Sequence, residues 1–113
     1  MEEFQSYNDI TPSLIQDWKA KFGPNSLREV TVDLPDEGLE YRFVLRKPGR
    51  GVMEAVATAG AKNDIAGSNK ILIANCVLGG DMAAIENDAA VYLQVLDEIR
   101  QLVGKTESTV KKL

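Results

Sequence analysis

The sequence of 113 residues contains 44% hydrophobic and 27% charged residues, and its net charge is −4. This length and composition are typical of one globular domain and argue against a disordered chain. The negative charge disfavours nucleic-acid binding, and no apolar run approaches the ~20 residues that a membrane-spanning helix needs.

The amino-acid composition argues against catalysis. There is one cysteine and no histidine, so the chain lacks the commonest general base and metal ligand and cannot form an internal disulfide. Cys76 lies in an apolar stretch, which predicts a core position. The closest acidic cluster is Asp81, Glu86 and Asp88, but its spacing is not that of a calcium loop, and helix capping is the favoured interpretation. We therefore predict no metal, no cofactor and no enzymatic activity.

The N-terminal part predicts an arm followed by a helix. Residues 1–10 are polar and acidic and are expected to form a flexible arm. Thr11 and Pro12 then provide a hydroxyl N-cap and a proline in the first helical turn, which predicts a helix over 12–22 that ends before Gly23. One face of this helix is apolar and consists of Leu14, Ile15, Trp18 and Phe22.

Two alternating segments, 28–34 and 39–46, predict a β-hairpin whose turn is Pro35-Asp36-Glu37-Gly38. The hairpin carries an uneven charge distribution. Acidic residues come first (Asp33, Asp36, Glu37 and Glu40), and basic residues follow (Arg42, Arg46, Lys47 and Arg50). The favoured interpretation is that opposite charges pair across the two strands. A basic surface for an acidic partner and a nucleic-acid contact are the alternatives.

Helical periodicity then continues toward the C-terminus. The spacing predicts helices over 51–61 and 65–78, with Gly79-Gly80 ending the second, and a long terminal helix between Asp88 and Gly104. Residues 105–113 are expected to form a polar tail. The predicted fold is α+β and mainly helical: an N-terminal helix, a hairpin and a three-helix bundle, all within a single domain over 11–104.

One combination of segments resembles a known family. Strand residues 43–46 lead into Lys47-Pro48-Gly49-Arg50, and a later stretch, 71–81, contains Asn75-Cys76 and Gly79-Gly80-Asp81 before the terminal helix. Over residues 28–103 this pattern resembles the small tail assembly chaperones of long-tailed bacteriophages and prophages. The helix around Trp18 has no clear counterpart in that family.

The resemblance implies a protein that binds the long, helical tape measure protein and keeps it soluble until tail tube subunits polymerise around it. It also implies a location in the cytoplasm of the bacterial host. A structural tail-completion or tube-associated protein is the main alternative, and a regulatory nucleic-acid-binding domain is a weaker one. Self-association through the terminal helix is a further expectation, because a two-fold contact needs one self-complementary face.

The partner-binding residues expected for this role fall into three groups. The first is a basic group, which would orient an acidic partner, and the others are apolar faces on the helix after the hairpin and on the terminal helix. They are, in that order, Arg46, Lys47 and Arg50; Val52, Met53 and Val56; and Tyr92, Leu96 and Ile99.

Overall fold

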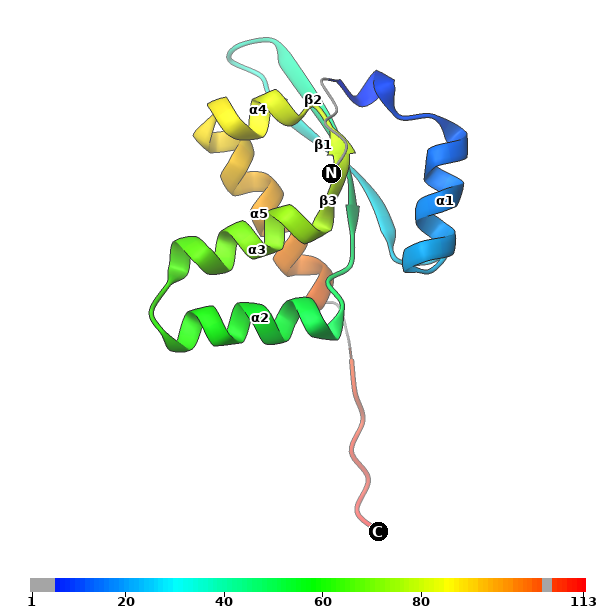
Figure 1. Cartoon of the computed structure of the whole chain (residues 1–113), viewed down its shortest axis with the longest axis vertical. Coiled ribbons are helices and arrows are strands. Elements are labelled where there is room, and N and C mark those ends of the chain that lie inside the picture. Colours follow the sequence, from blue (N-terminus) through cyan, green and yellow to red (C-terminus); the bar gives the residue numbers. More distant parts are fainter. Residues whose placement is uncertain (1–5, 105–106) are drawn as a thin grey trace.

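A computed structural model describes residues 6–104 and 107–113, which fold into helices around a three-stranded antiparallel sheet (Figure 1). The predicted α+β class, with an N-terminal helix, a hairpin and a long terminal helix, is confirmed. In chain order the elements are a 3-10 turn, η1 (Tyr7–Asp9), then α1 (Pro12–Phe22), β1 (Leu27–Leu34), β2 (Leu39–Arg46), α2 (Arg50–Ala61), α3 (Ile65–Cys76), β3 (Val77–Gly80), α4 (Met82–Asn87) and α5 (Ala89–Gly104).

The hairpin forms as its alternation predicts. β1 and β2 pair without interruption from Leu27 opposite Arg46 to Leu34 opposite Leu39. The turn closes with the Glu37 amide donating to the Leu34 carbonyl at 3.0 Å. Gly38 has a φ of 66°, a left-handed conformation that glycine adopts without the steric cost a side chain would bring.

Residues 77–80 differ from the expectation. The helix predicted over 65–78 ends at Cys76, and the next four residues form β3, which pairs antiparallel with β2. Gly80 permits this close approach. Its φ is 139°, and a Cβ there would collide with the Arg42 carbonyl and the Phe43 backbone. Gly80 thus allows β3 to lie against β2, and the prediction that Gly79-Gly80 ends a helix is wrong, because α3 already ends at Cys76.

A short helix, α4, is the second unexpected element. It occupies the interval between Asp81 and the terminal helix, for which no helix or strand was predicted. The predicted cap of α5 is present, since the Asp88 carboxylate accepts from the Ala90 amide at 2.9 Å and the Val91 amide at 3.2 Å. The Thr11 hydroxyl likewise accepts from the Leu14 amide at 3.1 Å at the start of α1.

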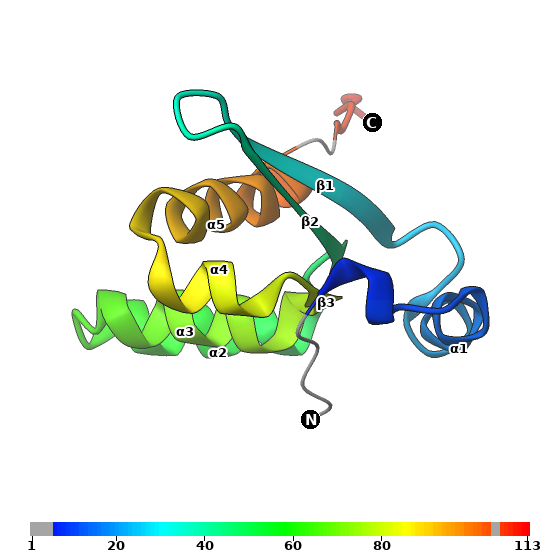
Figure 2. The same ribbon diagram turned by 90° about the horizontal axis from the view of Figure 1, so that it is seen from above.

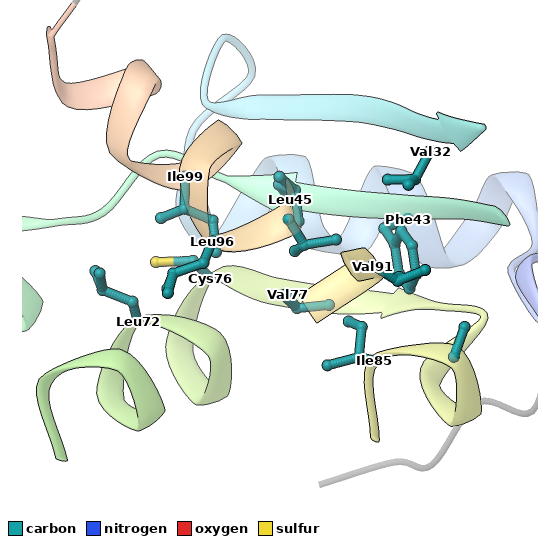
Figure 3. Packing of buried hydrophobic residues seen from close by; sticks show 12 residues of the cluster. Val32, Phe43, Leu45, Leu72, Cys76, Val77, Ile85, Val91, Leu96 and Ile99 are labelled. Carbon is teal, nitrogen blue, oxygen red and sulfur yellow. The ribbon is translucent and has the colours of Figure 1, made fainter. Parts of the chain in front are cut away.

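The core lies between one face of the sheet and helices α3, α4 and α5, with α2 packed outside α3 (Figures 2 and 3). Cys76 is fully buried there, as predicted, and burial raises the pKa of its thiol. The largest fully buried side chains are Phe43, Leu45, Cys76, Val77, Val91, Val95, Leu96 and Ile99.

The N-terminal segment covers part of the opposite face of the sheet, where Glu29, Thr31 and Arg42 remain exposed. Val44 lies between two core residues of β2, so its side chain points to this second face, where it is also buried. η1 contacts β2 and β3, and α1 contacts β1. Both views place α1 on the other side of the strands from α2–α5 (Figures 1 and 2).

The two predicted terminal segments are only partly described. Within the predicted arm, residues 6–10 form η1 and its flanks, while 1–5 lie outside the described residues. Within the predicted tail, residues 107–113 are exposed and adopt neither helix nor strand, while 105–106 lie outside the described residues.

Candidate functional site

The hairpin register overturns the expectation that opposite charges pair across the strands. Asp33 lies opposite Glu40, Thr31 opposite Arg42, and Leu27 opposite Arg46. Among the described residues there are two ion pairs, Arg42–Glu40 within β2 and Arg50–Glu54 within α2, and neither joins β1 to β2. The prediction failed because the acidic residues flank the turn on both sides, so that folding brings like charges together.

The result is a hairpin with charge separated along its length. Exposed carboxylates surround the turn and define the acidic tip: Asp33, Asp36, Glu37 and Glu40. Asp88 lies beside this tip, since a shallow hollow of about 240 Å³ is lined by Pro35, Asp36, Glu37 and Asp88 together. The tip therefore carries concentrated negative charge.

Basic side chains gather at the open end of the hairpin, where β1 begins and β2 ends. This basic end consists of Lys21, Arg28, Arg46, Lys47 and Arg50. The chain segments are held together by the Lys47 amide, which donates to the Ser26 carbonyl at 2.8 Å. The end of α1, the start of β1 and the start of α2 thus meet at one basic surface.

Arg46 is the structural anchor of the basic end. Its Nε donates to the Asn75 carbonyl at 2.7 Å, and its guanidinium lies 4.4 Å from the centre of the Phe22 ring. Lys21 approaches the same ring, with Nζ 5.3 Å from its centre. Arg46 thereby ties α1 to α3, so its role in this surface includes positioning.

Lys47 and Arg50 differ from Arg46 because their side chains extend into solvent. The Arg50 side chain is 92% exposed, and its partner Glu54 lies one turn further along α2. Lys47 is exposed and makes no ion pair within the described part of the chain. These two cations are accessible to another molecule.

The two helices that flank the basic end are only partly buried. Neither α1 nor α2 contains a buried residue, although both have an apolar face. On α2, the predicted residues Val52, Met53 and Val56 are half-buried and pack against the edge of the core. On α1, the apolar face is half-buried as well and consists of Leu14, Ile15, Trp18 and Phe22.

The structure does not bring the terminal-helix residues to this surface. Leu96 and Ile99 are 1% and 0% exposed and belong to the core, so they cannot form the partner surface expected of them. Tyr92 is half-buried and lines a different hollow with Ile85 and Asp88. Most of the apolar stripe of α5 is buried in the core of the same chain, because α5 packs against both α4 and β1.

A side chain that sequence reasoning considered only as a cap or a metal ligand has another role. The Asp81 carboxylate accepts from the Tyr7 amide at 2.7 Å and from the Arg42 amide at 2.8 Å. It therefore fastens η1 to the sheet. Desolvation raises the pKa of Tyr7, and the Glu29 carboxylate, to which Tyr7 hydrogen-bonds, raises it further. Only the fold reveals the hydrogen bond between the Tyr7 amide and the Asp81 carboxylate, because the two residues are 74 positions apart in the sequence.

Other site chemistry is limited. Within residues 6–104 and 107–113, no group of three or more acidic or cysteine side chains is placed to hold a metal ion. In the same part of the chain, no helix combines the length and the apolar character needed to cross a membrane.

Comparison with known proteins adds no further assignment. The chain matches no protein-family model, no curated protein and no solved structure.

Proposed function

We propose that this protein acts by binding another protein, as a non-enzymatic chaperone of phage or prophage tail assembly in the bacterial cytoplasm. Its partner in this proposal is the tape measure protein. The assignment to tail assembly rests on the resemblance of residues 28–103 to that family of chaperones. Binding at the basic end is supported by the geometry of the surface.

The observation that carries protein binding is the basic end between two helices with no buried residue. The exposed cations Lys47 and Arg50 are flanked by half-buried apolar side chains, of which Phe22 and Met53 are examples. Such a surface suits an amphipathic helix that has acidic residues beside its apolar face. The charges would mainly accelerate and orient the encounter, and apolar burial would supply the affinity.

The test is a pull-down with the tagged full chain from cells that express the phage or prophage tail genes, read by mass spectrometry. We expect recovery of one very long helical protein in near-stoichiometric amount. Changing Lys47 and Arg50 together to serine should reduce that recovery several-fold. Changing Lys62 and Lys70 to serine removes the same charge from exposed sites elsewhere and should leave recovery unchanged.

Three results would count against parts of this proposal. Recovery of tube or virion proteins without the tape measure protein, together with persistence of the chain in purified particles, would assign it to the tail structure. Equal recovery by the two serine variants would remove the basic end from the interface. A folded bait that recovers no tail protein would contradict the proposed function itself.

A further inference from the structure

The acidic tip and the basic end lie at opposite ends of the same hairpin. The two strands pair over eight residues each, from Leu27 opposite Arg46 to Leu34 opposite Leu39. At a rise of about 3.3 Å per residue, the strand ends are roughly 23 Å apart, and the nearest charges on β1, Arg28 and Asp33, are roughly 17 Å apart. At that distance they cannot neutralise each other within one molecule, because mobile ions screen exposed charges beyond ~8–10 Å at ordinary salt concentrations.

Apart from Arg46 and Lys21, which contact the Phe22 ring, the chain makes little use of these charges for its own stability. Asp33 directly faces Glu40, an arrangement that disfavours strand pairing. At the basic end, Arg28 donates only to the carbonyls of Asn25 and Leu27. Within the described residues, one ion pair is formed at each end, and both are exposed and local in sequence. Most of the charge at both ends therefore remains available to a molecule outside the chain.

We propose that the acidic tip of one copy docks on the basic end of a second copy, so that the protein associates head to tail. A second copy is the occupant because each chain carries both complementary surfaces. The tip has four carboxylates, Asp33, Asp36, Glu37 and Glu40, and the receiving surface has five cations, Lys21, Arg28, Arg46, Lys47 and Arg50.

Shape and apolar character agree with the charges. The hairpin turn projects beyond the helices beside it (Figure 2). It carries Leu39, which is 45% exposed and can contact the half-buried Phe22 and Met53 beside the basic end. Because the two surfaces are different patches, the contact is heterologous, and repeated contacts form a ring or an open filament.

This contact involves only copies of this chain, so it does not depend on the proposed partner. The charges are exposed, and exposed ion pairs are individually weak and sensitive to salt. We therefore expect association to be weak at physiological salt and to strengthen as salt is lowered. This route to self-association differs from the one expected through α5, whose stripe is largely buried.

The experiment is sedimentation of the purified full chain over a concentration series at about 0.02 M and about 0.5 M salt, where the screening length falls from roughly 20 Å to roughly 4 Å. We expect concentration-dependent growth in mass at low salt and association at least about tenfold weaker at high salt. Growth at neither salt concentration would overturn the proposal.

Two charge-reversal variants identify the surfaces. D36K/E37K removes the net negative charge of the acidic tip, because two lysines then balance Asp33 and Glu40, and K47E/R50E lowers the charge of the basic end from +5 to +1. Each variant alone should remain monomeric, while an equal mixture of the two should associate. The control K62E/K70E changes the net charge by the same amount as K47E/R50E and should retain self-association. Circular dichroism of each variant verifies the fold. Self-association of K47E/R50E alone, or no association in the mixture, would overturn the proposed contact.

Discussion

The packed body of the molecule and its two peripheral helices show that similar helix signals lead to different degrees of burial. The body consists of β1–β3 with α3, α4 and α5, and each of these helices has residues buried in the core. The peripheral helix α1 has a side-chain N-cap, and both α1 and α2 have an apolar face, yet neither helix contains a buried residue. Amphipathicity therefore indicates which face of a helix is covered, but the fold decides how completely.

The difference has an energetic and a functional consequence. Apolar burial is the main favourable contribution to folding, so the body should hold most of the stability. Regions with few buried contacts open locally at lower free energy, and partner-binding segments are commonly drawn from them. Here the peripheral helices flank the basic end, which places the least buried helices beside the exposed cations Lys47 and Arg50.

The largest expected effect comes from the body. Leu96→Ala removes a fully buried side chain from α5 and should destabilise the protein by about 2–5 kcal/mol through lost burial and the cavity left behind. Chemical denaturation followed by circular dichroism measures this change. A loss below about 1 kcal/mol would show that α5 is not the centre of the core.

A backbone effect should come next. Gly80→Ala forces a side chain into a positive-φ position where a Cβ would meet the backbone of β2. We expect a loss of about 1–3 kcal/mol and weaker β2–β3 pairing, measured by denaturation and amide exchange. Gly51→Ala is the matched control, because a Cβ there meets nothing within 4 Å and alanine favours the helix. Equal effects of the two substitutions would contradict the close approach of β3.

Leu96 and Gly80 also show what the sequence could and could not predict. Periodicity predicted the hairpin, α1, α2 and α5, because their apolar spacing matches the period of the element. Periodicity missed β3, because the four residues of this strand end in two glycines, and such a pair is also typical of the end of a helix. It placed Leu96 and Ile99 on a surface because an apolar stripe does not reveal its partner, and here the partner is the chain's own core.

The candidate site was predictable only in part. The cations at 46, 47 and 50 were evident from their density in the sequence. Their separation from the acidic tip depends on strand register, which no composition argument supplies. The hydrogen bonds of the Asp81 carboxylate with the Tyr7 and Arg42 amides could not be predicted, because they join residues distant in sequence.

A smaller, local loss of stability is expected when the Asp81 carboxylate is removed. Asp81→Ala removes the acceptor for the Tyr7 and Arg42 amides and should cost about 1–3 kcal/mol of local stability. Faster exchange of these two amides, measured by NMR, is the expected result. Asp36→Ala removes an exposed carboxylate at the hairpin turn and should leave both amides unchanged. Unchanged exchange in the Asp81 variant would show that η1 is held by other contacts.

The smallest expected effect is in the peripheral region. Leu14→Ala makes the same chemical change as Leu96→Ala, but on a half-buried face of α1, and should cost less than about 1 kcal/mol of global stability. Trp18, the only tryptophan, reports on the same helix, so its fluorescence should change more than the circular dichroism does. A loss as large as that of Leu96→Ala would remove the distinction between body and periphery.

Hydrogen–deuterium exchange of the unmodified full chain, followed by mass spectrometry, tests that distinction most directly. We expect amides in α1 and α2 to exchange through local openings of low free energy, while those in α5 and β2 exchange only near global unfolding. Protection in α1 and α2 equal to that in α5 would contradict this expectation, because the helices beside the basic end would then be as firmly packed as the core.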